Sequence, residues 1–247
     1  MTALKKLTWV EAKLFAREPI AVFWGLAFPA ALLLILGLFF PGGREPSPDL
    51  GGFRLVDLYA PITLGLALAT LAFATLPAIL ATYRERGLLR RLSTTPVGPR
   101  RLVGAQLIIQ LILAVLAGAL AIAVGAIVFD IPIPQNLPGF VLAYALAAAS
   151  MLALGLVIGA VAPTVSAGQG IGMAVYFPML FFAGVYFPRQ AMPEGLRSVS
   201  DMTPTGAAVQ ALQDTWAGLA PSASNLLVMS AFAIGAGVLA AAVFRWE

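Results

Sequence analysis

The chain has 247 residues, of which 60% are hydrophobic and 11% are charged, and its mean hydropathy of +0.94 indicates an integral membrane protein. With no cysteine and no histidine, it lacks disulfides, thiolate nucleophiles, imidazole bases and the commonest transition-metal ligands. Its net charge of +4 comes without interleaved aromatic and basic residues, so we expect no nucleic-acid partner and no catalytic, cofactor-binding or metal-binding residues.

The chain begins with an amphipathic stretch, residues 1–18. Its apolar residues recur at helical spacing: Ala3, Leu7, Val10 and Leu14. Lysine and arginine side chains fall on the other sides, which predicts a helix lying along the membrane interface. The apolar run that follows, residues 20–40, is too long for the core of a signal peptide, and we predict it as the first membrane span.

Five further apolar segments are predicted to cross the membrane. They cover residues 58–82, 102–129, 137–162, 171–187 and 226–244. Residues 131–188 hold no charged side chain, and these 58 residues are too many for one span. We place the break at residues 163–170, where Pro, Thr, Ser and Gly gather. Gly155 and Gly159 form a GxxxG pair that indicates close helix packing, by default within one subunit and alternatively at a dimer face.

Residues 188–216 are amphipathic, and neither half is apolar enough to cross a bilayer. We predict a re-entrant or surface-lying helical hairpin there. Six spans put both termini on one side, and that side carries eleven basic residues against four on the other, which favours cytoplasmic termini. The predicted protein is an all-α, multi-pass domain of the cell membrane covering residues 1–247.

The most hydrophilic stretch, YRERGLLRRLSTTPVGPRR at residues 83–101, lies between the second and third spans and holds six of the fifteen basic residues. Residues 86–92 predict a short amphipathic helix of about two turns, with Leu88, Leu89 and Leu92 on one side and guanidinium groups on the other. Any cytoplasmic loop of a membrane protein collects arginines, so charge alone has a topological explanation. The ordering of charge cluster, glycine, helix and Thr-Pro step favours a specific role.

Three parts of the sequence resemble the type-2 ATP-binding-cassette permeases, which export drugs, glycolipids and polysaccharides. ERGLLRRLSTTPVGPRRLVGAQ, residues 85–106, resembles the cytoplasmic loop of that family. FFAGVYFPRQAMPEGL, residues 181–196, is similar to the exit of its fifth span. The amphipathic start of the chain is the third likeness.

The resemblance implies that residues 84–95 are a coupling helix seated in a groove of a cytoplasmic ATPase subunit. The expected contact residues are Arg84, Glu85, Arg86, Leu88, Leu89, Arg90, Arg91 and Leu92, with the three leucines as buried anchors. The arginines either steer docking or bind phospholipid head groups. No lysine follows a glycine-rich phosphate loop, so ATP would be bound by the partner. A second permease copy, identical or related, would complete the transporter.

The expected function is ATP-driven export of a drug-like, lipid-like or glycoconjugate substrate. Phe177, Phe181 and Phe182 are candidates for lining its path, although such aromatics also face lipid or pack between helices. An ion-coupled secondary transporter is a rival, but it needs an ionisable residue at membrane depth, and the predicted spans place none there. A noncatalytic membrane assembly subunit would need only the spans and stays open.

Overall fold

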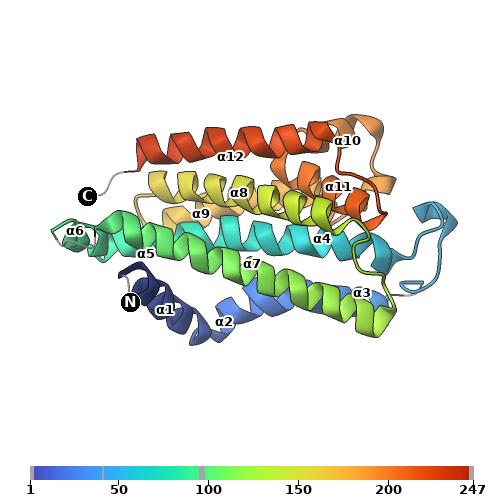
Figure 1. The fold of residues 1–247 in the computed structure, drawn as a ribbon, viewed down its shortest axis with the longest axis horizontal. Coiled ribbons are helices and arrows are strands. Elements are labelled where there is room, and N and C mark those ends of the chain that lie inside the picture. Colours follow the sequence, from blue (N-terminus) through green and yellow to red (C-terminus); the bar gives the residue numbers. More distant parts are fainter. Residues whose placement is uncertain (1–2, 41, 95–97, 245–247) are drawn as a thin grey trace.

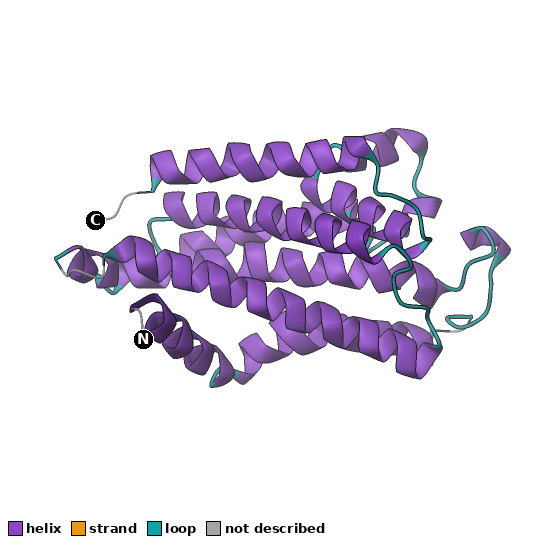
Figure 2. Cartoon of the chain, viewed as in Figure 1, coloured by secondary structure: helices purple, strands orange, loops and turns teal. Residues whose placement is uncertain are grey.

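The computed structural model of the protein describes residues 3–40, 42–94 and 98–244 as a bundle of helices extended along one axis (Figure 1). In these residues no β-strand forms, and six helical segments are long and apolar enough to cross a membrane (Figure 2). They cover Pro19–Phe39, Leu55–Glu85, Pro99–Phe129, Leu137–Val161, Val165–Phe182 and Ala223–Val243. The predicted all-α membrane fold with six spans is therefore confirmed.

Short elements gather at the two ends of the bundle (Figure 1). One end carries α6 (Leu88–Ser93), the beginning of α1 (Ala3–Ala16) and the last turn of α12 (Ala223–Val243), and we call it the α6 end. The opposite end carries α10 (Glu194–Asp201) and the loop that contains η2 (Pro48–Leu50), and we call it the α10 end. The first and last described residues thus lie toward the same end.

The first span changes its winding near its start. It consists of α2 (Pro19–Val22), a π-helical segment η1 (Phe23–Ala27) and α3 (Phe28–Phe39), with Pro29 in the first turn of α3. Proline has no N–H to donate along the helix, and its ring clashes with the carbonyl four residues earlier. A wider π-helical turn directly before the proline relieves this clash.

The second span repeats this arrangement at the centre of the bundle. It consists of α4 (Leu55–Ala69), the π-helical segment η3 (Thr70–Thr75) and α5 (Leu76–Glu85), with Pro77 in the first turn of α5. In its most apolar stretch 78% of the residues are buried, against 17% in α12. The other spans therefore pack around the second span, and a movement of this helix reaches most of the bundle.

The break between the fourth and fifth spans is shorter than predicted. Between α8 (Leu137–Val161) and α9 (Val165–Phe182) the loop has only three residues, so residues 165–170, expected in the loop, are helical. The hydroxyl of Thr164 accepts a hydrogen bond from the first turn of α9 and caps the helix early. At its other end α9 stops before Gly184, whose φ of 84° does not continue a right-handed helix.

The segment between α9 and α12 forms two helices with different environments. α10 is largely exposed, whereas α11 (Pro204–Trp216) is buried and packs against α4, α8 and α12. Arg189, in the 3₁₀ turn η4 (Arg189–Ala191), is 2% exposed and links the two helices. Its guanidinium pairs with Asp201 and donates to Oε1 of Gln210 at 3.1 Å. The predicted helical hairpin thus corresponds to α10 and α11, and the buried α11 does not lie on the surface of the bundle. Whether α11 enters the membrane stays a prediction.

Glycines bring α8 and α9 against the backbone of the central span. A Cβ atom added at Gly155 would lie 2.1 Å from the carbonyl oxygen of Ala72, and one at Gly172 would lie 2.2 Å from that of Phe73. Both carbonyls belong to η3, so each helix touches the π-helical segment at a point where a side chain does not fit. Gly159 packs against a side chain of α5 instead, because a Cβ atom added there would lie 2.6 Å from Cδ1 of Leu80. The GxxxG pair thus serves packing within one chain, which was the default interpretation.

Candidate functional site

The turn between α5 and α6 is the site predicted from the sequence. α6 begins at Leu88, three residues after the end of α5, because Gly87 adopts a left-handed φ of 64° that favours glycine. The N–H of Gly87 donates to the carbonyl of Arg84 at 2.9 Å, and its own carbonyl accepts from the N–H of Arg91 at 3.1 Å. These two hydrogen bonds connect the last turn of α5 directly to the first turn of α6, with no flexible linker between them.

The apolar side of α6 faces its own chain. Leu89 is 1% exposed and belongs to the main hydrophobic core, and Leu88 and Leu92 are half-buried against the same core. A side chain as buried as Leu89 has no surface left for another subunit. The expected role of Leu89 as an anchor in a partner therefore does not agree with its position, because the three leucines hold α6 on the bundle.

Arg84 points away from the exposed side of the turn and caps the end of α8. Its guanidinium donates to the carbonyl oxygens of Gly159 at 3.1 Å and Ala160 at 3.0 Å. It also donates to the carbonyl of Ala162 and lies over the ring of Phe244, 5.8 Å from the centroid. The last carbonyls of a helix lack partners within the helix and carry its partial negative charge, so a guanidinium stabilises them.

Glu85 makes the complementary contact with α9. Its carboxylate accepts a hydrogen bond from the backbone N–H of Val165 at 2.8 Å, in the first turn of that helix. The amino-terminal end of a helix carries partial positive charge, which favours a carboxylate there. Adjacent residues of opposite charge thus hold the end of α8 and the start of α9, and together they clamp the α8–α9 turn to the end of the central span.

Five arginines remain exposed at the α6 end: Arg86, Arg90, Arg91, Arg100 and Arg101. We call them the basic patch. They come from the α5–α6 turn, from α6 and from the first turn of α7 (Pro99–Phe129). Of the eight predicted contact residues, the structure therefore places Arg86, Arg90 and Arg91 on the surface, and it places Arg84, Glu85 and Leu89 in contacts within the chain.

A polar cluster that the sequence did not predict connects α1 to this site. Glu11 on α1 is 9% exposed and forms a side-chain hydrogen bond with Tyr83, the residue before Arg84. The Tyr83 hydroxyl has a single proton, which it donates either to Glu11 or to Oε1 of Gln106 on α7, 3.4 Å away. Burial raises the pKa of the Glu11 carboxyl above its ordinary value, and the bond to Tyr83 only partly offsets this.

The raised pKa of Glu11 predicts that α1 docks more firmly in acid. Because the folded protein binds this proton more tightly than the unfolded chain does, the stabilisation is complete below the ordinary carboxyl pKa and is lost as the pH rises through the raised folded pKa. Amide hydrogen exchange of α1 should therefore be faster at about pH 8 than at about pH 4, after correction for the intrinsic rate. Glu11→Gln should abolish the difference, and a pH-dependent difference that persists in this variant would contradict the assignment.

The three aromatic residues proposed for the transport path lie apart from this site. Phe177 is 55% exposed on α9 and contacts the ring of Tyr176. Phe181 and Phe182 pack edge to face, with ring centroids 5.7 Å apart, and the carbonyl of Phe182 accepts from Ser200 of α10. All three are thus placed on α9, and their contact with a substrate stays a prediction.

We call the contacts of Arg84 with α8 and of Glu85 with α9 the clamp. One pattern in the sequence could have indicated it. Residues 131–188 are free of charge, yet the break between their two helices leaves carbonyl and N–H groups that need partners. Those partners must come from another part of the chain. The charged pair Arg84 and Glu85, at the end of an otherwise apolar span, is a suitable source.

Comparison with known proteins identifies a family whose sequence pattern covers these features. A family model described as ABC-2 type transporter matches residues 2–216, which include the clamp, α6 and both helices of the segment between α9 and α12. A comparison with curated proteins found no match.

Proposed function

The chain belongs to the ABC-2 type transporter family, and from this premise we propose that it is the membrane-spanning subunit of an ATP-driven exporter. In this proposal a separate cytoplasmic ATPase subunit binds ATP and docks on the α6 end. A second copy of the permease, identical or related, forms the other half. The substrate is drug-like, lipid-like or a glycoconjugate.

The observation that carries the proposal is the rigid connection of α6 to three spans. α6 continues from the central span through one short turn; its Leu89 is buried in the core, and Leu88 and Leu92 pack against it. Arg84 and Glu85 fasten the adjoining ends of α8 and α9 to the same point. A push on the exposed side of α6 would therefore tilt these helices together, whereas a flexible loop would absorb the motion.

The basic patch provides the docking surface in this proposal. Eleven of the fifteen basic residues belong to the termini and to the stretch between the second and third spans, which supports a cytoplasmic position for the α6 end. Exposed positive charge accelerates and orients association with an acidic surface on a partner. Arg86 and Arg91, rather than the leucines, are the residues whose alteration tests docking without opening the core.

The test is charge reversal. In the double variant Arg86→Glu with Arg91→Glu, binding of a co-expressed P-loop ATPase from the same organism should weaken by about tenfold or more, because attraction becomes repulsion. Co-purification and a titration in detergent measure the loss. Leu89→Asp is unsuitable for this purpose, since it would place a charge in the core.

The matched control is Arg197→Glu, an exposed arginine on α10 at the opposite end. It should leave ATPase binding unchanged. Because the chain has no cysteine, single cysteines at positions 91 and 197 can also be labelled from either side of the membrane. Unchanged ATPase binding by the double variant, or labelling of position 91 from outside the cell, would refute the proposal.

A further inference from the structure

A cavity of about 460 Å³ lies at the α10 end, remote from the basic patch. Its walls come from the start of α4, the turn between α7 and α8, and the last turns of α11 with the residues that follow. The apolar part of the wall includes Phe53, Leu58, Pro61 and Trp216. This volume falls in the range of pockets that hold drug-sized molecules, about 300–1,000 Å³.

Hydrogen bonds from separate segments hold the walls in place. The indole N–H of Trp216 donates to the carbonyl of Pro132 at 2.6 Å. The Asn136 side chain donates to the carbonyl of Leu219 at 3.0 Å, and its backbone N–H donates to that of Thr215 at the same distance. The cavity is therefore formed before any ligand binds, which lowers the cost of ordering it on binding.

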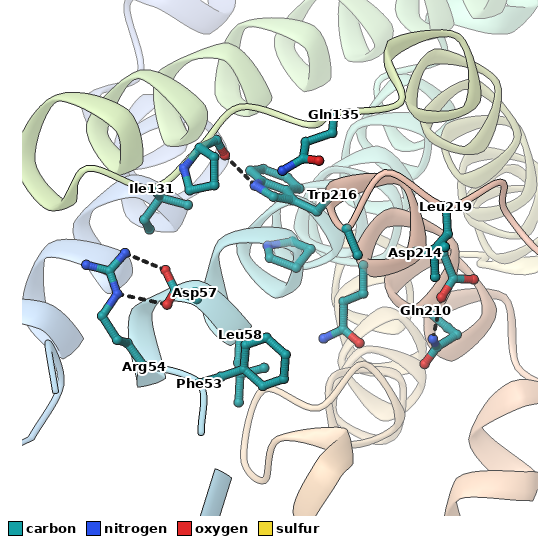
Figure 3. A pocket seen from close by; sticks show the side chains of 14 residues that line it. Phe53, Arg54, Asp57, Leu58, Ile131, Gln135, Gln210, Asp214, Trp216 and Leu219 are labelled. Carbon is teal, nitrogen blue, oxygen red and sulfur yellow. Dashed lines mark hydrogen bonds and ion pairs between the residues drawn. The ribbon is translucent and has the colours of Figure 1, made fainter. Parts of the chain in front are cut away.

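The one guanidinium in the wall is already neutralised. Nε and Nη2 of Arg54 donate to the two carboxylate oxygens of Asp57 at 2.8 and 2.7 Å. Its Nη1 donates to the carbonyl of Phe129 at 3.0 Å. Figure 3 shows this pair on one side of the cavity and Asp214 with Gln210 on the other. The Arg54–Asp57 pair thus contributes no net charge to the cavity.

Asp214 leaves an uncompensated negative charge. Its Oδ1 accepts a hydrogen bond from Nε2 of Gln210 at 2.8 Å, and Oε1 of Gln210 accepts from the buried Arg189. Within the described residues, the ion pairs are those of Arg54 with Asp57 and Arg189 with Asp201, so none includes Asp214. The lining residues carry one positive and two negative charges, and the cavity is therefore anionic.

Gln213, also in the wall, has a buried amide nitrogen. Its Nε2 is buried and has no hydrogen-bond partner among the described residues. A buried amide without a partner is destabilising, and such groups are rare unless a water or a ligand satisfies them. This nitrogen has almost no accessible surface and does not face a ligand, so the cavity offers a carboxylate for a cation beside apolar walls.

We propose that this cavity binds an amphiphilic organic amine, with its ammonium group at Asp214. The apolar body of the amine would lie against Trp216 and Phe53. An organic anion would be repelled by Asp214. A bare divalent cation would find too few oxygen ligands in a mostly apolar wall. The proposal stands independently of the proposed function, because it concerns a site formed within one chain.

The test uses three probes with one skeleton, naphthylbutylamine, naphthylbutanol and naphthylbutanoate. Equilibrium dialysis against the purified protein in dodecyl maltoside, with empty micelles as the blank, measures saturable binding. We expect one site that binds the amine about tenfold more tightly than the alcohol, and the carboxylate more weakly still. Equal affinities for amine and alcohol, or uptake that only parallels the blank, would overturn the proposal.

Variants assign the binding to this cavity. Asp214→Asn keeps an acceptor for Gln210 and should lower the affinity for the amine to that for the alcohol. Ala217→Trp fills the cavity from an exposed position and should abolish binding of both. Glu194→Gln, an exposed carboxylate on α10 outside the cavity, should change neither. Amine binding that survives both cavity variants, or a loss of amine preference in Glu194→Gln, would refute the assignment.

Discussion

Gly172→Val is expected to destabilise the bundle strongly. The new Cβ atom would lie 2.2 Å from the carbonyl oxygen of Phe73, and this backbone atom cannot move without disturbing η3. Overpacking a well-packed interior costs about 1–3 kcal/mol, and the backbone contact puts this case at the upper end. A loss of about 3 kcal/mol lowers the melting temperature by roughly 6–12 °C, which heating followed by size-exclusion chromatography measures.

Gly170→Val is the matched control. It lies on the same helix two residues earlier, is exposed, and would direct its Cβ atom into open space. Both variants replace glycine with the same β-branched residue in α9, so their intrinsic helix propensities change equally. Equal melting temperatures for the two variants would mean that α9 does not pack against the carbonyl of Phe73.

Arg84→Ala is expected to release the α8–α9 turn and to reduce coupling to the ATPase. The change removes the donor to three carbonyl groups at the end of α8. Charge-assisted hydrogen bonds of this kind contribute about 1.5–3 kcal/mol where they are partly buried. Amide hydrogen exchange over residues 162–168 should therefore become faster. Under the proposed function, the permease-dependent part of ATP hydrolysis should fall by about tenfold while the ATPase still binds.

Two variants separate this effect from a general loss of charge. Arg84→Lys keeps a cation at the end of α8 but lacks the planar fork that reaches several carbonyls, so it should give intermediate exchange rates. Arg86→Ala removes a neighbouring exposed arginine and should leave exchange over residues 162–168 unchanged. Wild-type exchange in Arg84→Ala would show that the clamp does not hold the turn.

The spans could be predicted because hydropathy alone determines them. Apolar runs of the length needed to cross a bilayer can form only helices there, since each backbone N–H and carbonyl must bond within its own segment. The amphipathic α6 was also predictable from Leu88, Leu89 and Leu92 on one side of a helix that follows Gly87. A helical pattern shows which side is apolar, but it does not show whether the chain itself or a partner covers that side. The burial of Leu89 within its own chain could therefore not be predicted from the helical pattern.

The burial of α11 and the clamp depended on tertiary contacts. α11 has moderate hydropathy because it contains glutamine, aspartate and threonine, yet its small residues Gly206, Ala207 and Ala208 let neighbouring helices approach closely. The partners of Arg84 lie 75 or more residues away along the chain. No local pattern encodes such a pairing, although the uncharged stretch of residues 131–188 shows that some pairing is needed.

The π-helical segment η3 also sets the rotational phase of everything that follows it in the second span. One residue advances an α-helix by about 100° around its axis, so the additional residue in a π-helical turn rotates α5 by about that angle relative to an unbroken α-helix. The azimuth of Arg84, and with it the direction in which α6 leaves the bundle, is thus decided by a winding change before Pro77. A second span of uniform pitch would keep every side chain and still present its basic turn to a different neighbour.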